Sequence, residues 1–308
     1  MAFITSSSLS NTVAPAILNI MDMENEAAIQ ASLRRTQLYT TMTSNTATEE
    51  VLNLGAISPD SWLTYQKTGE PGRAGMIEDF KTTFAHKDYP LNIEIPKNLI
   101  ADNNIPMVEH IAQGVRDSLE RRMEEDAASI FINAFTASAP YLLADGVALC
   151  SNSHPLSPAD SSTTQDNLDT VAFSYAQLKA ARVAMKKFTD HNNRRMGFMA
   201  DLVLMPVDLH DEAIEIINAE GKPKTADNDA NAVSGTTFFD WFALDSDTND
   251  WFVIDSNAMK RSLIWFDRSS EMSLDPIYQD TMKVIYQWKA RYSFGATDWR
   301  WIYGHQVA

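Results

Sequence analysis

The sequence contains little that could serve redox, metal or membrane chemistry. Its 308 residues include a single cysteine, Cys150, which excludes an internal disulfide and a cysteine metal site and favours plain packing. No run of about 18 apolar residues occurs, so we expect no transmembrane helix. The first basic residue is Arg34, and the chain therefore lacks the positively charged start of a secretory signal.

The motifs of common enzymes are absent as well. There is no HExxH, no phosphate-binding loop, no GxSxG and no GxGxxG, and no two of the six histidines are three or four residues apart. Asp227–Asn231 and Asp245–Asn249 open like calcium loops, but Phe238 and Ser256 stand where the twelfth-position acid belongs. We therefore expect no catalytic residue, no metal site and no cofactor.

Positive charge is scarce, and one segment has almost none. The net charge is −16, and thirteen acidic residues but only Lys222 and Lys224 lie between Asp201 and Asp255. A chain this acidic is not expected to bind nucleic acid tightly through its phosphates. It could still surround nucleic acid without holding it.

The composition is that of a folded chain, with 44% hydrophobic and 21% charged residues. Its length suits two domain-sized units. The first fifty residues are rich in Ser, Thr and Asn and are expected to form an arm that needs a partner.

A long hairpin is predicted after the arm. Between Val51 and Ile95, strand-like runs flank Thr68–Gly75, an eight-residue stretch with three glycines and one proline that is typical of a hairpin tip. A two-stranded hairpin is marginal in water by itself. We infer that another subunit covers it.

One long charged helix is predicted from about Pro106 to Phe135, roughly 45 Å at 1.5 Å per residue. Leu119 and Met123 lie on its apolar stripe, whose members recur at steps of three and four. Asp117–Arg121, Arg121–Glu125 and Arg122–Asp126 are i,i+4 pairs of opposite charge, and most of these charges are expected to face water. A rod of this length suits a flat, elongated shell subunit better than a compact globule.

Short alternating elements follow the helix. Ser174 and Gln177 are predicted to cap a helix, Leu202–Met205 reads as a buried strand, and Asp208 is expected to cap the next helix. The residues expected on the inner faces of the two helices are Leu178, Ala181, Met185 and Phe188, and then Ala213, Ile214 and Ile217.

The remainder alternates between loop and strand. Glu220–Gly235 is a polar loop, in which we expect no apolar anchor between Ile217 and Phe238. The β-rich runs Trp251–Ile254, Ser262–Phe266 and Met282–Phe294 predict strands. The fold class expected from these elements is α+β.

Two stretches resemble those of one family. Asp88–Asp102, followed by the long helix with its charged run Leu119–Asp126, resembles the entry to the spine helix of tailed-bacteriophage major capsid proteins, which have the Hong Kong 97-type fold. Asp145–Pro155 resembles the G-x-x-L-F-S-x-x-H-P stretch of Mu-like major head subunits, with Cys150 in the usual Phe place.

Two later segments keep the order of that family. Leu202–Pro206 precedes a predicted helix, and Trp251–Asp255 follows a polar loop, where the family has similar segments. The resemblance runs from Leu91 to the C-terminus, about two thirds of the chain. The family's motifs are structural, and no catalytic residue is carried over.

The resemblance implies a domain order. It has an N-terminal arm (1–50), an extended β-hairpin called the E-loop (51–90), a peripheral domain with the spine helix (91–140 and 271–308), and an axial domain (141–270). It also implies a structural head protein whose pentamers and hexamers form an icosahedral shell around double-stranded DNA.

The implied partners are further copies of the chain, a separate scaffolding protein, a portal and an optional decoration protein, with no membrane and no sequence-specific DNA binding. The fifty-residue arm is too short for a fused scaffold. The implied location is the virion, and the host cytoplasm during assembly. The residues predicted at assembly interfaces are Trp62, Tyr65, Gly69, Gly72, Arg73, Gly75, Leu119, Met123, Asp227 and Asp229.

Alternative functions stay open at this point. An encapsulin-like compartment has the same fold but would enclose a cargo enzyme and no genome. Another phage structural protein, such as a tail component, is a further alternative, although the long helix argues against a tube built mainly of strands.

Overall fold

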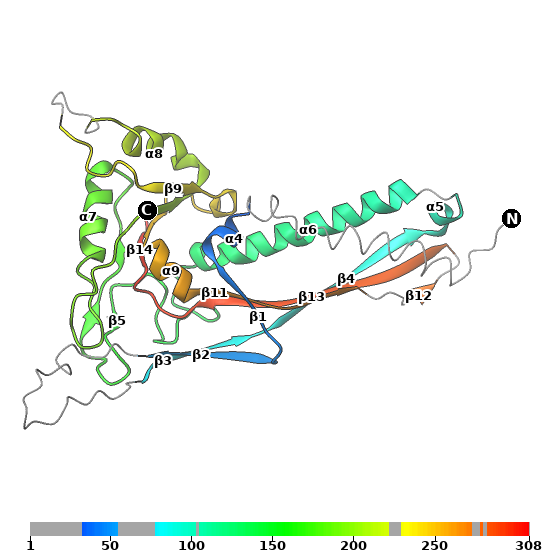
Figure 1. Cartoon of the computed structure of the whole chain (residues 1–308), viewed down its shortest axis with the longest axis horizontal. Coiled ribbons are helices and arrows are strands. Elements are labelled where there is room, and N and C mark those ends of the chain that lie inside the picture. Colours follow the sequence, from blue (N-terminus) through cyan, green and yellow to red (C-terminus); the bar gives the residue numbers. More distant parts are fainter. Residues whose placement is uncertain are drawn as a thin grey trace, which may run out of the picture. The chain divides into compact units, whose positions relative to one another are not determined.

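The chain forms two compact units (Figure 1). The computed structural model describes residues 33–54, 78–102, 105–221, 229–272, 278–279 and 282–307. Unit 1 takes its described residues from Met1–Glu49, Phe84–Ala127 and Trp265–Phe294, and unit 2 from Glu50–Thr83, Ala128–Ile264 and Gly295–Ala308. Both contain helices and strands, which confirms a mixed α/β chain.

A long antiparallel ladder is the frame of unit 1. Strand β4 (Lys87–Pro96) pairs with β13 (Lys283–Ala296) over ten residue pairs, from Lys283 opposite Pro96 to Tyr292 opposite Lys87. The sheet also contains β1 (Thr40–Thr43), β11 (Leu263–Met272) and β12 (Tyr278–Gln279), in the order β1-β11-β13-β12 with β4 on β13. The strands predicted near residues 91–96 and 282–294 are thereby confirmed.

One face of the ladder is apolar and the other is charged. The buried side chains are Ile93, Ile95, Val284, Tyr286 and Trp288. On the opposite face Lys283 pairs with Glu94, and Arg291 Nε lies 3.2 Å from Asp88 Oδ1. This alternation with a period of two is what a strand pair covered on one side requires.

Helix α6 (Ile105–Ile132) lies along β4 and β13 (Figure 1) and covers their apolar face. Pro106 stands in its first turn, where a missing N–H costs no helical hydrogen bond. Val108 and Ala112 are buried in the ladder core, and Val115 and Leu119 pack at its edge. The predicted long helix is confirmed, although it ends at Ile132 and not at Phe135.

The expectation that the paired charges of α6 face water is wrong for Asp126, and its neighbour Glu124 is buried as well. Glu124 is 2% exposed and Asp126 is 8% exposed. Glu124 accepts a hydrogen bond from the backbone N–H of Arg35 (3.0 Å), on helix α4 (Arg34–Leu38). Asp126 accepts one from the Tyr292 hydroxyl (2.7 Å). These partners offset the cost of burying the carboxylates, and periodicity alone could not reveal them.

Unit 2 is built on a second five-stranded sheet, in the order β7-β14-β10-β8-β9. Its strands are β7 (Leu168–Asp169), β14 (Ile302–His305), β10 (Trp251–Ile254), β8 (Leu202–Met205) and β9 (Thr237–Asp240). The outer pairs β14–β7 and β8–β9 are parallel, and the inner pairs are antiparallel. The predicted strands 202–205 and 251–254 are confirmed.

The core of unit 2 is aromatic. Phe131, at the C-terminal end of α6, makes edge contacts with Trp241, Phe252 and Trp301, with ring centroids 5.8–6.2 Å apart. Every residue of β8 and β10 is buried, as expected for central strands that are covered on both faces.

The described part of unit 2 also contains the helices α7 (Tyr175–Met185), α8 (His210–Ile217) and α9 (Ser256–Ser262). The predicted cap of α7 is confirmed, because Ser174 Oγ accepts a hydrogen bond from Gln177 N (3.4 Å). The residues predicted on its inner face, Leu178, Ala181 and Met185, are buried, as is Phe188 beyond the helix end.

The predicted start of α8 is wrong. Asp208 lies in a 3₁₀ turn, η4 (Val207–Leu209), and Leu209 is the N-cap without a side-chain hydrogen bond. This turn shifts the start of the helix, so Ile216 points inward with Ala213 and Ile217, while Ile214 is 40% exposed.

The loop after α8 has an apolar anchor that was not expected. Val233 is fully buried, and the Asn231 amide donates to the backbone oxygens of Ile216 (2.9 Å) and Ala219 (3.0 Å). The described part of this loop is therefore tied to unit 2 by packing and by hydrogen bonds.

The stripe of α6 can be tested with two neighbouring substitutions. Leu119→Asp would place a carboxylate against the ladder core, and we expect the free energy of unfolding to fall by about 3 kcal/mol. Ser118→Asp adds the same charge at an exposed position and should change it by less than about 0.5 kcal/mol. Chemical denaturation of the unassembled subunit measures both, and equal losses would show that the helix faces are assigned wrongly.

Candidate functional site

The described residues hold no candidate metal site, and their one cysteine is buried. Within them, no group of three or more His, Cys, Asp or Glu side chains is placed to hold a metal ion. Burial raises the pKa of the Cys150 thiol far above its ordinary value, so the thiol stays protonated. No helix in this part of the chain is long and apolar enough to cross a membrane. The functional candidates are therefore surfaces and the anchors that hold them.

The base of the predicted hairpin is present. Strands β2 (Thr48–Leu54) and β3 (Glu78–Ala85) form a two-stranded sheet. The Asn53 amide donates to the Thr297 carbonyl (2.7 Å), and Lys81 forms an ion pair with Glu50. The predicted interface residues Trp62, Tyr65, Gly69, Gly72, Arg73 and Gly75 lie outside the described residues.

The other predicted interface residues fall in different units where they are described. Leu119 packs at the edge of the ladder core in unit 1, and Met123 is half-buried. Asp229 is exposed in unit 2, next to the isolated β-bridge between Gly221 and Ala230. Asp227 lies outside the described residues. A role in assembly for these four stays a prediction.

The stretch that resembles the Mu-like motif is held by a buried polar network. His154 is fully buried, and its Nδ1 lies 2.7 Å from Asp145 Oδ2. Its ring stacks on Trp299 with centroids 4.4 Å apart. Gly146 adopts φ +82°, a conformation that a side chain would strain, in the turn that brings Asp145 back toward His154.

Asn167 completes this network from a distant part of the sequence. Its amide nitrogen donates to the backbone oxygens of Leu149 (2.9 Å) and Ile302 (3.2 Å). Its amide oxygen accepts from Ser151 N (2.7 Å) and lies 3.1 Å from His154 Nε2. Asn167 thus ties the motif loop to β14. Nothing in its sequence neighbourhood marks this role.

A second buried histidine closes the end of β14. His305 stacks on Trp251 with ring centroids 3.7 Å apart, and no described residue offers its ring nitrogens a hydrogen bond. Burial lowers the pKa of His305 to about 4, with Asp169 acting weakly in the opposite direction. The imidazole is therefore neutral at physiological pH and acts as a packing group.

Close approach of the backbone fixes one more residue of β14. A Cβ atom at Gly304 would lie 2.6 Å from Cys150 Sγ and 2.8 Å from Phe135 Cε1. No side chain fits there without displacing its neighbours. Gly304 is therefore packed tightly against Cys150 and Phe135.

Several acids of the segment 201–255 act within the subunit. Asp255 caps α9 by accepting from Asn257 N and Ala258 N, each at 3.0 Å. Asp250 accepts from Val307 N (2.8 Å). Burial, together with the charge of Asp247, raises the pKa of Asp250 to about 6. The acidity of this segment is therefore partly structural, which its composition did not indicate.

The described part of the chain thus combines a long ladder under a long helix with buried polar side chains that hold distant segments together. Residues 81–304 match the family model described as phage capsid protein. The chain belongs to the phage capsid protein family.

Solved structures agree with the family in fold. A structure from Microbacterium phage Oxtober96 has a TM-score of 0.55 at 11% identity, covering 90% of this chain and 91% of that one. A structure from Mycobacterium phage Patience has a TM-score of 0.54 at 13% identity, covering 97% of this chain and 88% of that one. The capsid of an empty GTA particle has a TM-score of 0.54 at 14% identity, covering 91% of this chain and 90% of that one. No curated protein matches the sequence.

The function that follows from the family is structural. The chain is a major capsid protein, and its place is the virion. The resemblance on residues 88–102 and 145–155 predicted this family correctly.

The network around Asn167 can be tested by truncation. Asn167→Ala leaves the carbonyls of Leu149 and Ile302 and the N–H of Ser151 without this partner inside unit 2. We expect a loss of about 3 kcal/mol in the free energy of unfolding. Asn257→Ala, at an exposed position of α9, should cost less than about 0.5 kcal/mol. A silent Asn167→Ala in chemical denaturation would remove the anchoring role.

The buried His305 predicts a pH dependence of stability. Its pKa in the folded chain is about 4, below its ordinary value of 6.5, so the unfolded chain binds more protons between these values. Stability should therefore fall as the pH drops from about 6.5 to 4, by up to about 3 kcal/mol from this group.

His305→Phe keeps the stacked ring and removes the titration, so thermal melts from pH 7 to 4.5 should lose part of their pH dependence. His110→Gln, an exposed change on α6, should leave the profile as in the parent. An unchanged profile for His305→Phe would show that other groups carry the acid sensitivity.

Proposed function

We propose that this chain is the shell-forming subunit of a Hong Kong 97-type capsid, whose pentamers and hexamers build an icosahedral shell around double-stranded DNA. The observation that carries the proposal is α6 lying along the β4–β13 ladder in unit 1, in a chain of the phage capsid protein family. In this proposal α6 is the spine helix.

The domains are proposed to follow the two compact units. Unit 1 supplies the core of the peripheral domain that the sequence predicted at 91–140 and 271–308, and unit 2 supplies the axial domain predicted at 141–270. Strand β14 lies in the sheet of unit 2, so we place residues 295–308 with the axial domain. Residues 1–50 are proposed as the arm.

The E-loop is proposed to extend from the β2–β3 base. Its stem strands carry exposed polar residues and only a few apolar ones, as expected for an element that gains its packing from a neighbouring subunit. The interface residues predicted from Trp62 to Gly75 belong to this element.

The remaining parts of the proposal concern surroundings and partners. The acidic segment, with Asp227 and Asp229, is proposed to lie near the capsomer axis, and a net charge of −16 suits a wall that does not hold the packaged genome. A separate scaffolding protein, a portal, a possible decoration protein and assembly in the host cytoplasm complete it. No enzymatic role is proposed.

Deleting Thr68–Gly75 tests the E-loop. We expect a folded subunit whose thermal melt resembles that of the parent, but at least tenfold fewer closed particles by electron microscopy, because a neighbour loses the surface it packs against. Replacing the same eight residues with a Gly/Ser linker of equal length separates the effect of sequence from that of length.

The particles that the unaltered chain forms test the proposed function itself. Closed icosahedral shells that package DNA during infection support the proposal. Tubes would favour a tail component, and shells that retain an enzyme cargo without a genome would favour an encapsulin-like compartment. Normal particles from the deletion variant would remove the hairpin from assembly.

A further inference from the structure

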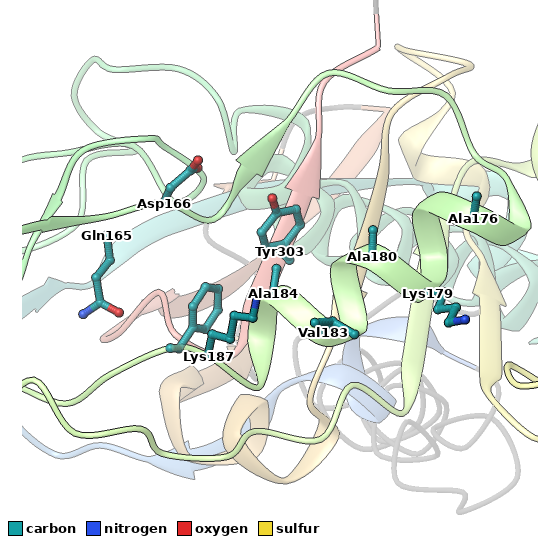
Figure 2. Close-up of a pocket in the computed structure, with 10 residues that line it drawn as sticks. Gln165, Asp166, Ala176, Lys179, Ala180, Val183, Ala184, Lys187 and Tyr303 are labelled. Carbon is teal, nitrogen blue, oxygen red and sulfur yellow. The ribbon is translucent and has the colours of Figure 1, made fainter.

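An open groove with a volume of about 690 Å³ lies in unit 2 beside helix α7 (Figure 2). Figure 2 shows the α7 side chains on one side, Gln165 and Asp166 on the other, and Tyr303 of β14 between them. Ala176, Ala180 and Ala184 recur every four residues along the helix, so they form one low stripe. Val183 beside them is 46% exposed.

The groove is bordered by positive charge in an acidic chain. Lys179 and Lys187 line it and are exposed, and no described carboxylate lies within ion-pair distance of either. From Tyr175 to Lys187 the chain has four basic residues and no acidic one. Asp166 is the acid across the groove, and the Tyr303 phenol is neutral because burial raises its pKa to about 12.

A projecting apolar pair lies at the other side of the same sheet. Val207 and Phe242 follow the ends of the parallel strands β8 and β9 and are 44% and 58% exposed. Trp241 N donates to Met205 O (3.1 Å), which keeps these two chain segments side by side up to the turns η4 and η5 (Phe242–Leu244). We call Val207 and Phe242 the knob.

The border of the knob is acidic. Asp208 follows Val207 directly, Asp245 lies three residues after Phe242, and Asp211 lies in the first turn of α8; all three are exposed. The knob thus has the opposite charge to the groove and an aromatic side chain to fill it. A Phe side chain buries about 150–250 Å² when it enters such a site.

The two surfaces cannot meet within one copy. The groove lies at β14 and near β7, and the knob at β8 and β9, on opposite sides of the sheet order β7-β14-β10-β8-β9. With strands about 4.8 Å apart, β14 lies about 10 Å from β8 and about 14 Å from β9. Complementary patches at two different places on one unit produce head-to-tail contacts, which close into rings when the rotation allows.

We propose that the knob of one copy docks into the α7 groove of the next copy, with Phe242 against the alanine stripe and the acidic border against Lys179 and Lys187. The inference rests on the proposed function, because it identifies the contact by which subunits meet around a capsomer. In this contact each copy uses two surfaces of unit 2. Its knob enters the groove of the next copy, and its groove receives the knob of the preceding copy.

Charge reversal tests the electrostatic part. Lys179→Glu/Lys187→Glu in the full chain should reduce capsomers and shells at least tenfold, by native mass spectrometry and electron microscopy. Adding Asp208→Lys/Asp245→Lys to the same chain should restore a large part of the loss. Lys186→Glu/Arg195→Glu changes charge equally at exposed positions outside the groove and should assemble like the parent.

A cross-link tests the geometry without relying on a loss of assembly. The native Cys150 is buried, so introduced cysteines are the thiols that react. Shells of Val183→Cys/Phe242→Cys treated with a short bismaleimide should give a ladder of covalent multimers on a denaturing gel. The control pair Val183→Cys/Met199→Cys, with Met199 70% exposed before β8, should stay monomeric.

The outcomes separate this contact from the shell function. If the parent forms shells, but the cysteine pair gives no ladder and the lysine reversal assembles normally, the docking is wrong and the shell function stands. If the parent forms neither rings nor shells, the proposed function is overturned together with it.

Discussion

The packing of α6 on the apolar face of the β4–β13 ladder is the contact on which unit 1 depends. A ten-pair ladder leaves its outer face to ion pairs and its inner face to Ile93, Ile95, Tyr286 and Trp288. The inner face is too long for a short helix to cover, so one long helix must do so. An extended ladder under an extended helix has a large surface for its volume, which suits a subunit that gains further burial from neighbours.

Buried polar groups then fix the details that apolar packing leaves open. Asp126 binds the Tyr292 hydroxyl of β13, and Glu124 binds the backbone at the start of α4, so that helix position and strand position are set together. Asn167 does the same in unit 2, where it joins the motif loop to β14. Losing one partner of such a group leaves the other without a hydrogen bond, and the unsatisfied buried group lowers the free energy of unfolding.

The charged residues also divide into those that stabilise the subunit and those that stay exposed on its surface. Some acids of the segment 201–255 cap helices or hold the C-terminal backbone, while others stay exposed around the knob. From Tyr175 to Lys187, by contrast, the chain has four basic residues and no acidic one. A strongly acidic protein can therefore repel nucleic acid as a whole and still present one surface that attracts its own copies.

The sequence by itself determined the long helix, the buried strands 202–205 and 251–254, the Ser174 cap and the family, because periodicity, capping and motif order are local properties. It could not show that Glu124 and Asp126 are buried, that a 3₁₀ turn displaces the start of α8, or that Val233 anchors its loop. Nor could it bring Asn167 to His154, or join the end of β8 to Trp241 after β9. Each of these depends on residues far apart in the chain that only the tertiary structure brings into contact, where burial and hydrogen bonding decide between alternatives of similar local preference.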